Sequence, residues 1–322
     1  MGSLPLRNYD IGEVVSTAHC EKGIVNNNWI ITSSKGKFVL RQIPGGRRYS
    51  DILFEQELLA KLNRARLSFE IPRPLSSTMS TPVIRFKRKY YWMYQCIGGE
   101  SRKPLTADDC TKIACAMAEL HRKTARMKLA HDKRWTTPFQ SRWLIKEILK
   151  LLRNSGDSNA DRYFHNHAEE VIAALRELHP GAYMQLPRIP IHADIFSENI
   201  LFKDGRLTGV IDFDNCHIGT RIRDLTTFID WECRDSRAMR LDLDKVRLFV
   251  KAYREHAMLS TEEISYIPDI SISANIVRFW YMYWVMRHCP ERKLTTARMK
   301  EAISCMRWVK KNRDEIIERL SS

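Results

Sequence analysis

The chain has 322 residues and carries 53 Lys and Arg against 38 Asp and Glu, a formal net charge of +15. This length is more than one compact core usually needs and predicts two lobes, and a hydrophobic content of 44% excludes a generally disordered chain. The basic balance favours anionic partners, which include phosphates, nucleic acid and acidic metabolites.

Membrane insertion and secretion are not indicated by the sequence. No run of about 18 uncharged apolar residues occurs, and the first residues contain no apolar segment of a signal peptide. The eight cysteines are scattered without a C-x-x-C pair, which disfavours a zinc ribbon and is typical of reduced thiols. We therefore expect a cytoplasmic protein without a membrane partner.

The first hundred residues predict β-structure with one helix interposed. Three β-rich runs are expected as strands, at 12–20, 28–34 and 37–43. The next run, 50–66, has apolar residues at helical spacing, with Ser50 or Asp51 as N-cap.

A hairpin is predicted at 82–97, with Lys87 and Lys89 at its exposed turn. The same run mixes bases with aromatic residues and could also form a nucleic-acid patch, but the alternation after Tyr90 favours the hairpin. The following Gly-Gly-Glu-Ser at 98–101 breaks the pattern and predicts a hinge between lobes 1–97 and 98–322.

Beyond the hinge the chain is predicted to be mostly helical. A helix at 106–127 begins with Thr106 as cap and acidic residues in its first turn. Further helices are expected at 140–154 and 168–179, then almost continuously from residue 222 onward. The exceptions after 222 are loops expected near 234 and at 265–273.

Three polar side chains between these helices suggest a catalytic device. Asp194 and Asn199 are five residues apart, and Asp212 follows Asn199 by thirteen residues across a predicted β-hairpin. A tight hairpin would bring Asp212 beside Asn199, and two such oxygens suit Mg²⁺. Asp194 would then be free to accept a proton from an attacking hydroxyl, as phosphoryl transfer requires.

The segments "HADIFSENILF" and "GVIDFD" resemble the catalytic and metal-binding segments of the aminoglycoside phosphotransferase superfamily, including its homoserine-kinase-like branch. The resemblance covers most of the chain, through "GIVNNNWIITSSKGKFVLRQ", "IPRPL", "YQCIGGES" and "RDLTTFID". It implies an α+β, bilobal, protein-kinase-like fold, with a small β-rich N-lobe containing one αC-type helix and a larger helical C-lobe.

The resemblance implies the following roles for residues of the catalytic segments. Asp194 would be the catalytic base, and Asn199 and Asp212 would bind Mg²⁺. His192 would brace the loop as a structural residue, and Asp224 would tie the loop to the helical lobe.

For nucleotide binding, the resemblance implies that backbone groups of Gln95, Cys96 and Ile97 contact adenine and that Glu57 is the αC acid. The family pattern has Lys where this chain has Arg41, which can still pair with Glu57 and touch phosphate. Lys37 on the same strand face could substitute for it. The phosphate loop has Gly23 alone, so that Asn26 and its neighbours must supply the turn.

The acceptor is expected between Asp194 and the late helices. Candidate substrate residues are Asp214, Trp231, Glu232, Arg278, Tyr281 and Arg287. The aromatic residues of 276–288 could equally be core. The charge of +15 fits a neutral or carboxylate-bearing metabolite, such as an amino acid or sugar, better than a polycationic aminoglycoside.

We therefore expect an ATP- and Mg²⁺-dependent kinase acting on the hydroxyl of a metabolite such as a homoserine-like amino acid or a sugar. An aminoglycoside or choline-type kinase remains an alternative. The rival from another class is a catalytically weak binding or structural protein of the same fold, as suspected for spore-coat relatives.

Overall fold

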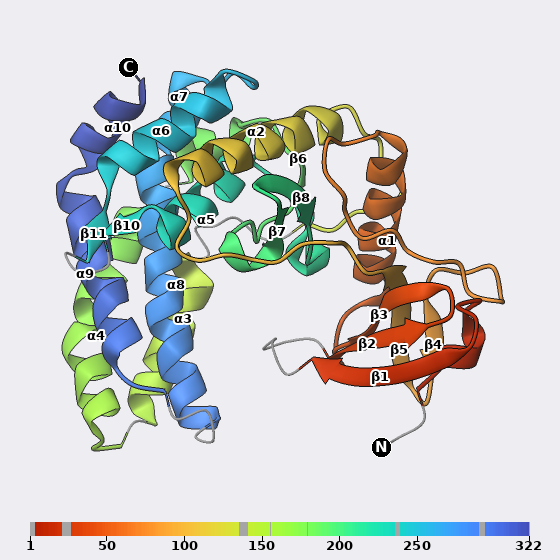
Figure 1. Ribbon diagram of the computed structural model, residues 1–322. Coiled ribbons are helices and arrows are strands. Elements are labelled where there is room, and N and C mark those ends of the chain that lie inside the picture. The colour runs from red at the N-terminus through yellow and green to blue at the C-terminus, as the bar shows by residue number, and fades with distance from the viewer. Residues whose placement is uncertain are drawn as a thin grey trace.

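The computed structural model describes residues 4–20, 27–134, 141–154, 156–178, 180–235, 239–289 and 294–321. A β-sheet with one packed helix forms one end of the molecule, and a group of helices forms the other (Figure 1). Short strands lie between the two ends. This mixed arrangement has the predicted α+β character.

The sheet is antiparallel, with the strand order β1-β2-β3-β5-β4. Its strands are β1 (Val14–Cys20), β2 (Asn27–Ser33), β3 (Gly36–Ile43), β4 (Ile84–Phe86) and β5 (Lys89–Gln95). The central strand β3 is buried on both faces: Leu40 belongs to one apolar cluster and Val39 to the other. Since side chains alternate along a strand, Arg41 shares the face of Val39, which packs toward the helix.

That helix is α1 (Tyr49–Arg64), and its buried stripe contains Ile52, Glu55, Leu59 and Leu62. The expected cap at Ser50 or Asp51 is wrong, because Arg48 is the N-cap and forms no side-chain cap bond. Asp51 instead lies in the first turn, where it accepts hydrogen bonds from the Arg48 guanidinium.

The predicted hairpin is confirmed as β4–β5, and its turn residues Lys87 and Arg88 have the positive φ values of 46° and 64° that tight hairpins require. The segment 98–101, where a hinge was expected, follows the hairpin. There Glu100 exchanges backbone hydrogen bonds of 2.9 Å with Phe202. The segment after the sheet is thus anchored to the middle of the molecule.

The helical part agrees with the sequence in most places. Its helices are α2 (Ala107–Thr124), α3 (Ser141–Arg153), α4 (Asn159–Glu177), α5 (Ile222–Glu232), α6 (Leu243–Arg254), α7 (Thr261–Ser265), α8 (Ile267–His288), α9 (Ala297–Lys311) and α10 (Arg313–Ser321). Thr106 caps α2 as predicted, in a reciprocal capping box with Asp109. Within the described ranges, none of the helices has both the length and the apolar character that crossing a membrane requires.

The loop expected at 265–273 is wrong. Pro268 lies in the first turn of α8, where its missing N–H costs nothing and its fixed φ suits a helix. Near residue 234 the chain forms the short strand pair β10 (Arg234–Asp235) and β11 (Arg240–Leu241) rather than only a loop.

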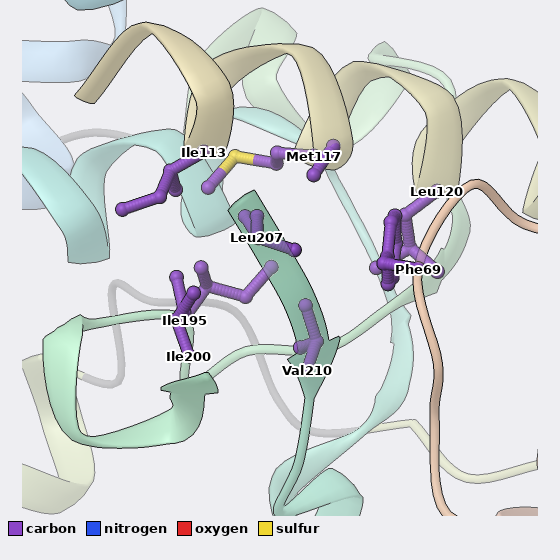
Figure 2. Close-up of a pocket in the computed structure, with 9 residues that line it drawn as sticks. Phe69, Ile113, Met117, Leu120, Ile195, Ile200, Leu207 and Val210 are labelled. Atoms are coloured by element: carbon purple, nitrogen blue, oxygen red, sulfur yellow. The ribbon is translucent and has the colours of Figure 1, made fainter. Parts of the chain in front are cut away.

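Two short antiparallel pairs of strands lie between the sheet and the helices. They are β6 (Ile189–Ile191) with β9 (His217–Gly219), and β7 (Ile200–Lys203) with β8 (Arg206–Val210). Figure 2 shows Ile195, Leu207 and Val210 meeting Ile113 and Met117 of α2. The void among these apolar side chains is only about 10 Å³, no larger than one water, so this contact is packing that fixes the β7–β8 hairpin beneath α2.

Candidate functional site

The loop between β6 and β7 carries His192, Ala193 and Asp194, and a buried carboxylate shapes it. Asp224, in the first turn of α5, accepts the backbone N–H of His192 at 3.0 Å and of Ala193 at 2.5 Å. Ala193 has a φ of 66°, a left-handed conformation that costs free energy in an L-residue. The two charge-assisted bonds therefore hold the turn that presents Asp194.

Asp224 is itself tied to the helical part. His121 of α2 contacts its Oδ2 through Nε2 at 2.9 Å, and His121 Nδ1 contacts the Tyr253 hydroxyl at 2.8 Å. Burial raises the pKa of Asp224, but its bonds to His121 and the loop outweigh that effect and leave the pKa below its usual value.

His192 braces the loop from within, as the sequence suggested. Its Nδ1 accepts the Asp194 backbone N–H at 3.2 Å, so Nε2 carries the proton and donates to the Ile211 carbonyl at 3.0 Å. Burial lowers the pKa of His192, which keeps the ring neutral. Both ring nitrogens are occupied by backbone groups, which leaves this side chain no proton to exchange with a substrate.

The structure brings Asn199 and Asp212 together at the open end of the β7–β8 hairpin, because Asn199 precedes β7 and Asp212 follows β8. Ile211, next to Asp212, donates its backbone N–H to the Asn199 carbonyl at 2.9 Å. Asn199 in turn donates Nδ2 to the Asp194 carbonyl oxygen at 2.9 Å. Since Nδ2 is used in this way, the amide Oδ1 of Asn199 can act as a ligand.

The carboxylate of Asp194 is perturbed. Burial raises its pKa to about 7, and the negative charge of Asp212 adds to the rise. A hydrogen bond from Asn215 Nδ2 to Asp194 Oδ2, 3.2 Å long, opposes it. A carboxylate with a pKa near neutrality in a partly open loop is suited to accepting a proton.

Asp212 adopts a left-handed conformation with φ 66° and ψ 63° and meets Arg41 of β3. The Arg41 guanidinium donates to Asp212 Oδ1 at 2.6 Å. Burial raises the pKa of Asp212, but the charge and hydrogen bond of Arg41 outweigh it, and the pKa lies below its usual value. The carboxylate is therefore ionised, and 37% of its side-chain surface remains exposed.

Arg41 belongs to a buried charge cluster that we define as Arg41, Arg47, Glu55, Asp212 and Asp214. Its guanidinium lies 3.1 Å from Asp214 Oδ1 and 3.8 Å from Glu55 Oε1. Arg47 completes the cluster with contacts of 3.1 Å to Asp214 and 3.5 Å to Glu55. Asp214, which was expected to contact the substrate, is thus buried, and both arginines engage its carboxylate.

The pairing of Arg41 with Glu57 is also wrong, because Glu57 points away from the sheet. Its carboxylate accepts the backbone N–H groups of Ala130 and His131 at 2.9 and 3.0 Å, and Lys61 lies 2.8 Å away. The acid that reaches Arg41 is Glu55. Sequence reasoning missed it although a carboxylate on the apolar stripe of α1 was a signal.

The other residues expected to contact the nucleotide lie at or after the end of β5, or near the start of β3. Gln95 closes β5, and Cys96 donates its backbone N–H to the Lys37 carbonyl at 2.9 Å, while Ile97 is buried. The Lys37 side chain is exposed at the far end of β3, so it does not reach the cluster that Arg41 occupies. Gly23 and Asn26 lie outside the described residues.

Three of the substrate candidates line one pocket of about 290 Å³: Trp231, Glu232 and Arg278. Arg287 lies elsewhere, paired with Asp161 at 3.1 Å beside a different pocket. Tyr281 belongs to the aromatic row of α8 and stacks against Trp284 with ring centroids 6.3 Å apart. Arg278, Tyr281 and Arg287 therefore do not line one pocket, although all three lie on α8.

In the part of the chain that the structure describes, no group of three or more His, Cys, Asp or Glu side chains is arranged to hold a metal. Asn199 and Asp212 offer an amide oxygen and a carboxylate, which are hard ligands that suit Mg²⁺ when phosphate and water complete its shell. The donor chemistry of the site thus fits a magnesium ion bound together with a phosphate.

Comparison with known proteins places this geometry in context. Residues 18–259 match the model of a phosphotransferase enzyme family. A homoserine kinase of Neisseria meningitidis serogroup B is 26% identical over 298 residues, which cover 89% of this chain and 88% of the relative.

Solved structures give the same picture of the fold. A microcompartment-associated aminopropanol kinase matches with a TM-score of 0.69 at 19% identity, covering 98% of this chain and 97% of that one. An amicoumacin kinase in complex with AMP-PNP, Ca²⁺ and Ami matches with a TM-score of 0.66 at 15% identity, covering 93% and 88%. The predicted protein-kinase-like fold is confirmed.

Proposed function

The chain belongs to the phosphotransferase enzyme family, and we propose that it is a kinase that transfers the γ-phosphate of ATP to a hydroxyl of a small metabolite. A homoserine-like amino acid, a sugar or a related compound would be the acceptor. The relatives named above support this activity. The observation that carries it is a half-buried carboxylate, Asp194, with a pKa near neutrality beside the hard-ligand pair Asn199 and Asp212.

In the proposed reaction Asp194 is the catalytic base. It accepts the proton of the acceptor hydroxyl as that oxygen forms a bond to the γ-phosphorus, and the bond from the γ-phosphorus to the bridging oxygen of ADP breaks. The transfer is direct and in line, without a covalent enzyme intermediate. Asn215 orients the carboxylate, and His192 with Asp224 fixes the loop that carries it.

Asn199 Oδ1 and the Asp212 carboxylate would hold Mg²⁺, which when bound neutralises phosphate oxygens. Arg41 bonds Asp212 through Oδ1 at 2.6 Å, which leaves Oδ2 to bind the metal. Arg41 would also bind a phosphate oxygen, since guanidinium groups bind oxyanions through paired N–H donors.

We further propose that residues 1–97 form the nucleotide-binding lobe and residues 98–322 the catalytic lobe. Backbone groups of Gln95, Cys96 and Ile97 would contact adenine at the end of β5. Gly23 and Asn26 would supply the turn over the phosphates. Glu55 takes the place of Glu57 as the acid that steadies Arg41.

A coupled assay of ADP release with Mg-ATP and a panel of hydroxyl-bearing metabolites tests this function, with phosphorus NMR to identify the phosphorylated product. Asp194→Asn should reduce turnover by about 10²- to 10⁴-fold, because general-base catalysis contributes that much. Binding of Mg-ATP should persist in this variant. Undiminished turnover by Asp194→Asn would refute the assignment of the base.

A further inference from the structure

The pocket of about 290 Å³ that contains Trp231, Glu232 and Arg278 adjoins the loop that carries Asp194. The Trp231 ring stacks on Phe196, with centroids 5.6 Å apart, and Glu232 Oε1 accepts the Ser197 backbone N–H at 2.9 Å. Phe196 and Ser197 follow Asp194 by only two and three residues. Two residues that line the pocket therefore contact the proposed catalytic loop, and the size of the pocket suits a small acceptor.

The lining of this pocket is cationic. Its charged residues are Lys103, Arg234, Lys245, Arg278 and Arg298 against Asp230, Glu232 and Glu301. Arg234 is neutralised by Glu301 at 2.9 Å, and Lys103 lies 3.9 Å from Glu232. Within the described residues, Arg278 forms no ion pair of 4.0 Å or less. The charges of Asp230 and Glu301, which line the same pocket, act on Arg278 without a direct ion pair to either, so its guanidinium keeps N–H donors for a ligand in the pocket.

Arg278 is also held in a defined orientation. Its guanidinium lies 4.2 Å from the centroid of the Trp231 ring, and its NH1 is 3.5 Å from Asn275 Oδ1. A guanidinium stacked on an aromatic ring keeps its N–H donors at its edge, where they can meet a planar anion. Trp231 contacts both Arg278 and Phe196, so an anion bound at Arg278 would be positioned relative to the catalytic loop.

The electrostatic surroundings agree with an anion site. The pKa of Arg278 is lowered to about 10, chiefly by burial and also by the positive charge of Arg234, while the carboxylates of Asp230 and Glu301 oppose the shift. The group stays charged at neutral pH. An anion in the pocket would replace the lost water and offset the repulsion between the two arginines.

We propose that this pocket binds an anionic group of the phosphoryl acceptor, a carboxylate or a phosphate ester, through the guanidinium of Arg278. The inference rests on the proposed kinase function and narrows its acceptor to acidic alcohols, such as hydroxy acids and hydroxyl-bearing amino acids. Neutral sugars and polycationic aminoglycosides lack the group that Arg278 would bind.

Matched acceptors test the proposal with the intact enzyme and Mg-ATP. One set is glycerol, glycerate and glycerol 3-phosphate, and the other is 3-aminopropan-1-ol and homoserine, which differ by one carboxylate. The kcat/KM should be about 10- to 100-fold higher for an anionic member than for its uncharged or cationic counterpart, as charge-assisted hydrogen bonds predict. The glycerate and glycerol 3-phosphate arms distinguish a carboxylate from a phosphate.

Arg278→Gln should remove this preference, mainly through KM, and Arg278→Lys should restore part of it. Arg307→Gln is the control, because Arg307 is an exposed arginine of α9 that pairs with Glu170. Thermal unfolding checks that each variant folds. If Arg278→Gln does not fold, the comparison of kcat/KM values between matched acceptors in the wild type, together with Arg278→Lys, remains decisive.

Phosphorylation that is indifferent to the anionic group overturns the inference and leaves the kinase function standing. A preference that survives in Arg278→Gln also overturns it. Failure to phosphorylate any alcohol in either set, or in the wider metabolite panel, counts instead against the proposed function.

Discussion

The raised pKa of Asp194 predicts that this side chain destabilises the folded protein at neutral and alkaline pH. We consider the substitution Asp194→Asn, which keeps the size of the side chain and removes its charge. The amide can still accept the 3.2 Å hydrogen bond from Asn215 through its oxygen. The variant should therefore be inactive as a kinase but more stable than the wild type.

The magnitude follows from the pKa values of the two states. Burial raises the pKa from 3.8 to about 7 in the folded protein, and an unfolded chain keeps the ordinary value. The pKa of Asp194 is higher in the folded protein than in the unfolded chain. The stability that depends on a protonated Asp194 is therefore fully present below pH 4 and is lost as the pH rises to 7. Proton linkage then lowers the free energy of unfolding by at most about 2 kcal/mol at pH 5 and about 4 kcal/mol at pH 8.5.

The assay is urea unfolding of the wild type and of Asp194→Asn at pH 5 and pH 8.5. The free energy of unfolding of the variant should exceed that of the wild type, and the excess should grow by about 2 kcal/mol between the two pH values. Glu198→Gln is the matched control, because it removes an exposed carboxylate from the same loop.

A difference between Asp194→Asn and the wild type that does not change with pH would refute the reasoning. So would a variant that is less stable at pH 8.5. Either result would mean that the Asp194 carboxylate is well solvated or well paired in the folded protein, and its role as a base near neutral pH would lose its physical support.

Two further predictions concern carboxylates that hold the site together. Asp212→Ala should abolish the Mg²⁺-dependent part of ATP binding, measured by calorimetric titration with and without the metal; an unchanged Mg-ATP affinity would contradict the metal role. Asp224→Asn should lower the free energy of unfolding by about 3 kcal/mol, since it weakens the bonds to His192 and Ala193 and leaves His121 poorly paired. An unaltered urea midpoint would exclude that account of Asp224.

The features that the sequence predicted well depend on local rules. Thr106 is the N-cap expected at the start of α2, and the turn at Lys87 and Arg88 joins two strands with alternating patterns. The proximity of Asn199 and Asp212 also follows from a local rule, because a hairpin returns the chain to its starting point. In each case the residues that interact are close in the sequence.

The wrong choice of acid on α1 arose because the direction in which each helical position points was not worked out. Three acids lie in this helix, and the sequence reasoning selected Glu57. The buried stripe contains Ile52, Glu55 and Leu59 at spacings of three and four, which place Glu55 toward the sheet. An acid among apolar positions is costly unless a cation meets it, so the helical period could have identified Glu55, rather than Glu57, as the acid of this helix that needs a cationic partner.

The contacts of Arg41 could not have been derived in this way, because they join distant segments. Arg41 and Asp212 are 171 positions apart, yet they form the shortest contact of the charge cluster, 2.6 Å. The three carboxylates of the cluster, from Glu55, Asp212 and Asp214, meet two guanidinium groups, and the buried ammonium of Lys133 donates to the Asp214 carbonyl at 2.7 Å and opposes the rise in the pKa of Glu55. Asp212 is the partly exposed carboxylate of the three, with 37% of its side-chain surface exposed, and it is therefore the one that a divalent cation would reach.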